Sequence, residues 1–284
     1  MCELFALSSR IPTTVGFTLE RLARRGGIEG PHRDGWGVAF YEGADVFLLR
    51  EPRAAAQSDL VRYIERHAPP SQLVVSHIRR ATRGEPALRN TQPFVRELGG
   101  YTHVFAHNGE LGGIERRRDF LPGRFRPVGD TDSELVFCSL LDRLDDLWTA
   151  AGGCLPPLPE RLEVVAAFAG ELREFGPANF LYADGDALFA HAHRRIQADG
   201  HEGPPGLHLL ERSGEEPPAD LATSGVTLTS VRQEAVLLAS VPLTDEPWQP
   251  LPEGEVVVVM NGAVVARAPC FGSKVIHSIE TTRE

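Results

Sequence analysis

The chain has 284 residues, enough for one sizeable domain, and its 42% apolar and 24% charged residues are an ordinary globular mixture. Its formal net charge of −10 argues against nucleic acid or an anionic membrane as the main partner. No stretch approaches the length of a membrane-spanning helix, and the first residues lack the basic and apolar regions of a signal peptide. The four cysteines are widely spaced with no C-x-x-C pair, so we expect no disulfide framework, no cysteine metal site and a reducing cytoplasm.

The chain opens on a cysteine that is followed by an apolar run. Leu4–Leu7 predicts a short buried strand. Removal of Met1 would leave Cys2 with a free α-amine beside its thiol. Their reference pKa values of roughly 8 and 8.5 allow proton transfer between them at about 1 kcal/mol. The amine could therefore act as the base for the thiol. The alternative for Cys2 is an inert core thiol.

The rest of the first half predicts short helices and strands. Helical spacing covers 17–23, and Asp34-Gly35-Trp36-Gly37 leads into a hairpin over 38–49. A capped helix is expected over 58–65, and strands are expected at 73–78 and 102–107.

The second half contains the clearest helix, which begins at Thr131. Thr131 and Glu134 form a capping-box sequence, and apolar residues recur behind it at helical spacing. Another helix is expected over 161–172. It is followed by strands at 180–183, 187–190 and 236–240 and a hairpin over 256–266 around Asn261-Gly262. Asp199–Asp220 is rich in proline, glycine and charge and predicts a surface loop. With no repeat and no linker, we expect a single domain, 1–284, of stacked sheets with helices outside.

Arg79 follows directly on the strand at 73–78. Strand ends open onto clefts, and a guanidinium matches a carboxylate with two parallel hydrogen bonds. The alternative is one more surface arginine in an arginine-rich chain. Arg80 points the opposite way, so at most one of the two faces the same pocket.

Asn108-Gly109 ends the strand at 102–107. Asn-Gly is a common hairpin signature, but here no second strand follows, unlike at Asn261-Gly262. We therefore expect a strand that ends at an irregular loop, where a side-chain amide and a backbone N–H could bind one oxyanion.

Acidic and histidine side chains supply the remaining candidates. Asp132, at the start of a helix, either stabilises the helix dipole or binds a ligand ammonium. Asp34 is a turn residue or a site residue. His191 and His193 share a strand face, but no third ligand is suitably spaced, so no metal is expected.

Taken together, these motifs resemble the class II glutamine amidotransferases, which are N-terminal-nucleophile hydrolases. Four motifs stand in the family's order, and the likeness covers nearly the whole chain, most closely to the stand-alone bacterial members. The matching stretches are Met1-Cys2, His77–Pro86 with Asn90-Thr91-Gln92-Pro93, Ala106–Leu111 and Asp130–Glu134.

The resemblance implies an α+β fold, a four-layer αββα sandwich of two mainly antiparallel sheets flanked by helices. It also implies that Cys2 attacks the glutamine amide and that a γ-glutamyl thioester is hydrolysed to glutamate, with the α-amine shuttling protons. By matching position, Asn108 and Gly109 would hold the oxyanion. Arg79 and Thr82 would bind the α-carboxylate and Asp132 the α-ammonium. No cofactor is implied. Relatives that synthesise amino sugars have Trp at the position of Arg80. Because this chain differs there, the sequence does not decide whether the segment Arg79–Ala87 closes over the substrate.

Three functions remain open at this stage. The first is a cytoplasmic glutaminase or amidotransferase subunit acting on L-glutamine. The chain has no room for a synthase domain, so its ammonia would go to a separate synthase or be released. The second is a hydrolase of another γ-glutamyl amide, as in relatives from ergothioneine synthesis and glutathione breakdown. The third is a catalytically silent domain that senses glutamine.

Overall fold

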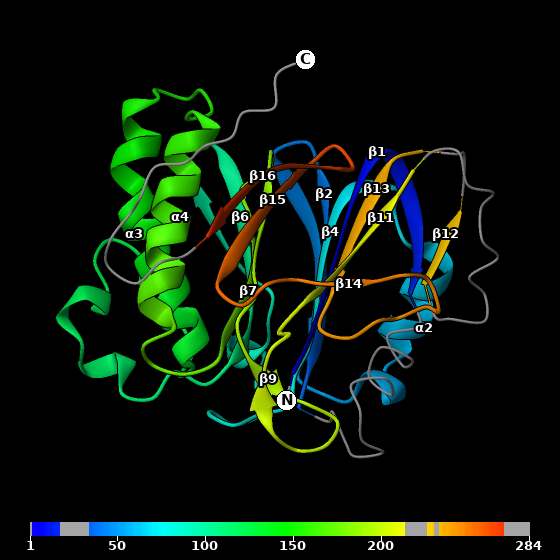
Figure 1. The fold of residues 1–284 in the computed structure, drawn as a ribbon, viewed down its shortest axis with the longest axis horizontal. Coiled ribbons are helices and arrows are strands. Elements are labelled where there is room, and N and C mark those ends of the chain that lie inside the picture. Colours follow the sequence, from blue (N-terminus) through cyan, green and yellow to red (C-terminus); the bar gives the residue numbers. More distant parts are fainter. Residues whose placement is uncertain (1, 18–33, 214–225, 230–232, 270–284) are drawn as a thin grey trace.

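The computed structural model describes residues 2–17, 34–213, 226–229 and 233–269. Two antiparallel sheets lie face to face in the middle of the molecule, and helices cover their outer faces (Figure 1). In that view, α3 and α4 lie at the left and α2 lies at the lower right. Among the described helices, none is long and apolar enough to cross a membrane.

The first sheet has eight strands in the order β14-β11-β13-β1-β4-β2-β3, and β12 also pairs with β1. The long β1 lies between β13 and β4, so the start of the chain is held in the interior of this sheet. The strands are β1 (Glu3–Phe17), β2 (Trp36–Glu42), β3 (Asp45–Glu51), β4 (Ser71–Ile78), β11 (His208–Arg212), β12 (Val226–Thr229), β13 (Ala235–Ala239) and β14 (Gln249–Pro250).

The second sheet has six strands in the order β16-β15-β8-β7-β6-β5. A separate two-stranded sheet pairs β9 with β10. The strands are β5 (Phe94–Leu98), β6 (Tyr101–Gly109), β7 (Ala178–Ala183), β8 (Leu188–His191), β9 (Arg195–Ile196), β10 (Glu202–Gly203), β15 (Glu255–Met260) and β16 (Ala263–Pro269).

The helices bury apolar faces against the outer surfaces of the sheets. Apolar residues of α2 (Asp59–His67) pack on the first sheet, and those of α3 (Asp132–Ala150) and α4 (Leu158–Leu172) pack on the second. The short 3-10 helices are η1 (Ala55–Gln57), η2 (Leu88–Asn90), η3 (Ile114–Arg116) and η4 (Arg118–Phe120).

Side-chain alternation along β1 separates the layers. Leu4 and Ala6 pack between the two sheets, whereas Phe5 and Leu7 pack on the outer side with α2. On β6, Val104 and Ala106 fill the space between the sheets and Phe105 faces the helices α3 and α4. The predicted four-layer αββα sandwich is therefore confirmed.

Helix α3 begins where the capping sequence predicts. The Thr131 hydroxyl accepts a hydrogen bond from the Glu134 N–H at 3.2 Å. The Glu134 carboxylate does not accept a hydrogen bond from the Thr131 N–H, as it would in a complete capping box. It accepts from the Gly129 N–H and the Arg96 guanidinium, both at 2.6 Å, and so ties the helix start to β5.

One segment does not follow the sequence expectation, and another lies mostly outside the described residues. The surface loop predicted for Asp199–Asp220 is wrong over Glu202–Gly203 and His208–Arg212, which form β10 and β11. Leu209 and Leu210 are buried, so a short apolar pair within a polar segment completes the first sheet. The helix predicted over 17–23 lies outside the described residues except for Phe17, which ends β1.

Candidate active site

Cys2 lies just before β1 with its thiol against the end of β4. The thiol donates to the Arg80 carbonyl oxygen and accepts from the Arg80 N–H, both at 3.3 Å. The side chain is half-buried, and burial raises the pKa of the thiol. The thiolate form of Cys2 is therefore disfavoured in this environment.

Asn108 brings a side-chain amide to Cys2. It shares the inter-sheet face of β6 with Val104 and Ala106, and its Nδ2 donates to the Cys2 carbonyl oxygen at 2.6 Å. A side-chain amide has two N–H groups, so the second one is available to an oxyanion. The sequence placed these two residues in one site, and the structure brings them together.

The direction of the Gly109 N–H follows from the neighbouring residue. The Gln92 side chain takes both backbone groups of His107: Oε1 accepts from the N–H at 2.6 Å, and Nε2 donates to the carbonyl oxygen at 3.2 Å. The backbone groups of His107 therefore point away from β7. Because successive residues of an antiparallel strand alternate, those of Asn108 face β7 and the Gly109 N–H points away from it again.

Only glycine fits at position 109. A Cβ there would lie 1.7 Å from the Pro177 carbonyl oxygen. After Gly109 the chain leaves the sheet, whereas Asn261-Gly262 joins β15 to β16 as a tight turn. Both Asn-Gly pairs thus have the local structures that their flanking sequences predict.

Arg79 is the best-connected arginine near Cys2. It is 3% exposed, and its two terminal nitrogens donate to four backbone carbonyl oxygens at 2.7–3.2 Å. Three of these acceptors belong to residues 83–85 and the fourth belongs to Asp34. Burial lowers the pKa of this guanidinium. Arg79 therefore fastens the following loop onto the end of β4, and its Nε–H is the remaining donor.

The residues around this loop differ in how they are held. Asp34 accepts from the Ala81 N–H at 2.8 Å and so ties the segment before β2 to the loop that follows Arg79. Thr82 is exposed on the loop. The Arg80 side chain is also exposed and has no hydrogen bond or ion pair within the described part of the chain. Of these two adjacent arginines, only Arg80 has a free guanidinium.

Asp132 lies against the segment that follows the oxyanion candidates. It is 8% exposed, and Oδ2 accepts from the Leu111 N–H at 2.8 Å while Oδ1 accepts from the Ser133 N–H at 2.8 Å. The Ser133 hydroxyl also contacts His107 Nδ1 at 2.9 Å. The start of α3 is thus bonded to both sides of Asn108-Gly109, so Asp132 and the oxyanion candidates belong to one unit.

A buried ion pair at the residue after Cys2 was missed by the sequence reasoning. Glu3 and Arg195 are 2.9 Å apart and almost fully buried, and Arg195 also donates to the Ser240 carbonyl oxygen. Burial raises the pKa of Glu3 to about 7. A glutamate inside the apolar start of β1 was the available signal, since a buried charge calls for a partner.

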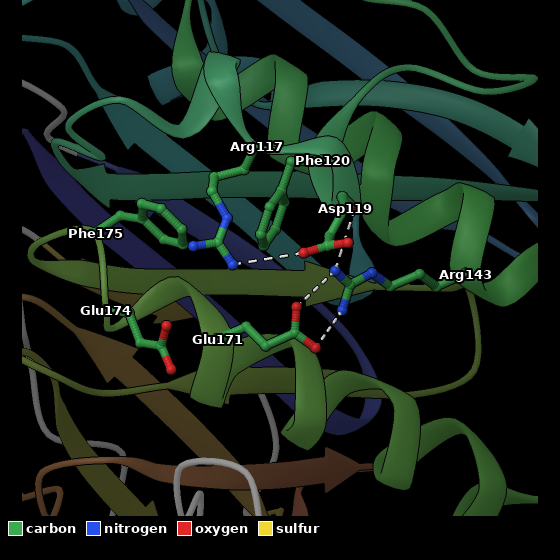
Figure 2. A pocket seen from close by; sticks show the side chains of 7 residues that line it. All are labelled: Arg117, Asp119, Phe120, Arg143, Glu171, Glu174 and Phe175. Carbon is green, nitrogen blue, oxygen red and sulfur yellow. Dashed lines mark hydrogen bonds and ion pairs between the residues drawn. The ribbon is translucent and has the colours of Figure 1, made fainter.

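One pocket lies away from this cluster, between η4, α3 and α4 (Figure 2). It encloses about 570 Å³, and most of its charges pair with one another. Arg143 donates to both Glu171 oxygens at 2.8 and 2.9 Å, and Arg117 lies 3.5 Å from Asp119. Within the described ranges, no group of three or more His, Cys, Asp or Glu residues is placed to hold a metal ion.

Comparisons with known sequences show the family of this chain. The family described as class II glutamine amidotransferases matches residues 1–281. YafJ of Escherichia coli K12, a glutamine amidotransferase by name, is 36% identical over 256 residues, which cover 90% of this chain and 96% of YafJ. A Haemophilus influenzae protein of similar name is 31% identical over 268 residues, covering 94% and 86% of the two chains.

Solved structures extend the agreement to the fold. A predicted glutamine amidotransferase from Pseudomonas aeruginosa PA01 has a TM-score of 0.67 at 35% identity, covering 93% of this chain and 100% of the other. The Bacillus subtilis glutamine phosphoribosylpyrophosphate amidotransferase has a TM-score of 0.58 at 14% identity, covering 95% of this chain and 49% of its own, which shows a shared fold only. By its sequence, its fold and the motifs around Cys2, this chain belongs to the class II glutamine amidotransferases.

Proposed function

We propose that the protein is a glutaminase, or the glutaminase subunit of an amidotransferase, that hydrolyses the side-chain amide of glutamine with Cys2. The observation that carries this proposal is the contact between Asn108 and Cys2, with the Gly109 N–H next along the strand. A nucleophile and two oxyanion donors at one end of the inter-sheet layer match the needs of acyl transfer.

In the first half of the proposed reaction, a bond forms between Cys2 Sγ and the amide carbon. The carbonyl oxygen becomes negative and is held by the Asn108 amide and the Gly109 N–H. The C–N bond then breaks. The α-amine of Cys2, free after removal of Met1, passes the thiol proton to the leaving nitrogen, so ammonia departs and a γ-glutamyl thioester remains. Because burial raises the pKa of the thiol, this proton transfer must accompany the attack.

In the second half, water adds to the thioester through a like oxyanion. The C–S bond breaks, glutamate leaves and the thiol regains its proton through the α-amine. Hydrolysis thus regenerates Cys2 without a cofactor or a change of oxidation state.

Substrate recognition in this proposal uses three charged or polar groups. Arg79 and Thr82 bind the α-carboxylate, and Asp132 binds the α-ammonium. Since Arg79 already donates to the carbonyls of residues 83–85, a carboxylate must take its Nε–H or replace some of those carbonyls. We therefore infer that the position of segment Arg79–Ala87 depends on the substrate.

The proposed setting is the cytoplasm, with residues 1–284 acting as one domain. Cys2, Cys138 and Cys154 are free thiols, which suits a reducing compartment. We propose that the ammonia passes to a separate synthase or is released.

The test is release of ammonia and glutamate from L-glutamine by the purified protein, with Cys2→Ala as control. Intact-mass analysis shows whether Met1 has been removed. Release that disappears in Cys2→Ala supports the proposal. Turnover of γ-glutamyl peptides or thiols instead of glutamine would replace it with a γ-glutamyl hydrolase. Glutamine binding with no turnover of either class would indicate a silent sensing domain.

A further inference from the structure

Asn179 is a fully buried polar residue on β7, directly opposite Asn108. Its amide makes three hydrogen bonds. Nδ2 donates to the Asn108 carbonyl oxygen at 3.0 Å and to the Arg194 carbonyl oxygen at 2.7 Å, and Oδ1 accepts from the His193 N–H at 2.7 Å. Both amide N–H groups and the amide oxygen of Asn179 are therefore engaged with backbone groups.

The bond to Asn108 bears on the oxyanion donor. In a trans peptide the C=O and the N–H point in opposite directions. The Asn108 carbonyl and the Gly109 N–H belong to the same peptide, so a group that holds this carbonyl on the β7 side also aims the N–H away from β7. Rotation of the peptide would break the bond to Asn179 and remove the N–H from the site.

The other bonds of Asn179 lead back to the nucleophile. His193 and Arg194 directly precede Arg195, which pairs with Glu3, the residue after Cys2. The Asn108 amide in turn donates to the Cys2 carbonyl oxygen. Asn179 thus joins the Asn108–Gly109 peptide to the segment that anchors the start of β1, and hydrogen bonds together with short stretches of backbone link Asn179, Arg195, Glu3, Cys2 and Asn108 in one loop.

Gly206 shows how tightly this amide is enclosed. A Cβ at Gly206 would lie 1.6 Å from Asn179 Oδ1, so the backbone of residue 206 packs directly on the amide. The amide therefore has little room to turn.

We propose that Asn179 is a positioning residue that holds the Asn108–Gly109 peptide in the orientation required for oxyanion binding. This inference rests on the proposed function, because orientation of an oxyanion donor matters only if an acyl intermediate forms. Asn179 would affect the reaction only by fixing the direction of the Gly109 N–H.

The test compares Asn179→Asp and Asn179→Ala with the wild type. Asp has nearly the same shape but sets a carboxylate oxygen against the two carbonyl oxygens that now accept hydrogen bonds, whereas Ala only removes the donors. Loss of one oxyanion donor typically lowers kcat by about 100- to 1000-fold. We expect about that loss for Asp and a loss of about 10-fold or more for Ala, where the β-ladder still supports the peptide. KM should change by less than about twofold, since the donor acts in the transition state.

Two controls separate positioning from general damage. Alkylation of Cys2 by iodoacetamide forms no oxyanion, so its rate should match that of the wild type in both variants. Tyr182→Phe removes another buried hydrogen bond from β7, the one between Tyr182 and His103 at 2.7 Å, and should lower Tm without lowering kcat.

Normal kcat in both Asn179 variants would overturn the inference. It would also be overturned if the Asn179 variants and Tyr182→Phe lost Tm equally and the Asn179 variants lost no more kcat than Tyr182→Phe. If Asn179→Asp fails to fold, the result with Asn179→Ala decides. If the wild type turns over neither glutamine nor γ-glutamyl p-nitroanilide, the proposed function fails, and crystal structures of the variants then test the inference alone. A rotated Asn108–Gly109 peptide supports it, and an unchanged peptide overturns it.

Discussion

Replacement of Gly109 by Ala should abolish most of the activity while leaving the protein folded. The new Cβ would lie 1.7 Å from the Pro177 carbonyl oxygen and 2.8 Å from His107 Nε2. Ordinary contacts begin near 3.4 Å, so one of the two backbone segments must move by about 1.7 Å, the difference between these distances. A misplacement of about 1 Å in a catalytic group can lower the rate about 100-fold.

The moved atom is the proposed oxyanion donor, so the expected loss in kcat is about 100- to 1000-fold, or about 3–4 kcal/mol of transition-state stabilisation. In the proposed function Arg79 and Asp132 still bind the substrate in this variant, so KM should change little. The assay is steady-state ammonia release from glutamine, or from a chromogenic γ-glutamyl amide, with Tm measured on the same sample.

Gly112→Ala is the matched control, three residues farther along the same segment. A Cβ there would meet only the Phe175 carbonyl oxygen, at 3.8 Å, and the backbone of Gly112 suits any residue. We expect kcat within about twofold of the wild type. If Gly109→Ala kept full kcat, or if Gly112→Ala lost as much, the assignment of the Gly109 N–H to the oxyanion would be refuted.

Three further substitutions test the loop, the pH response and the core. Arg79→Ala removes three hydrogen bonds to the following loop and one to Asp34, and should lower Tm and raise KM about 10-fold or more. Arg80→Ala should leave Tm unchanged. A drop in Tm for Arg80→Ala alone would reverse their roles. Burial lowers the pKa of His103 to about 4. As pH falls below about 6.5, this histidine is therefore protonated in the unfolded chain but not in the folded protein. The protein therefore loses about 3 kcal/mol of stability through this group between about pH 6.5 and 4. Urea unfolding across that range should show a smaller decrease in the free energy of unfolding for His103→Gln than for the wild type. An equal decrease would contradict the low pKa of His103. Arg161→Leu leaves the Asp184 carboxylate buried without its partner, which lies 2.7 Å away in the wild type. The free energy of unfolding should fall by about 3–5 kcal/mol while KM stays unchanged. A loss of less than about 1 kcal/mol would contradict this prediction.

Local patterns along the chain were sufficient for several features. The Thr131 cap, the helix behind it and the contrast between the two Asn-Gly pairs all follow from residues within a few positions of each other. Such features depend on backbone hydrogen bonding and side-chain periodicity, which are local. The loop prediction over 199–220 failed because the two leucines of β11 are recruited by a sheet made of distant strands.

The amino-acid sequence by itself determined the order of motifs, the family resemblance and the residue types that could serve as nucleophile, oxyanion donor and charge partner. Only the tertiary structure decided which of them meet. Arg79 binds the loop beside it, Glu3 finds Arg195 across 192 positions, and Asn179 holds the peptide of Asn108 across 71. These contacts cannot be read from spacing, because they depend on how two sheets pack. A buried polar group takes as its partner whichever group the packed strands bring near it.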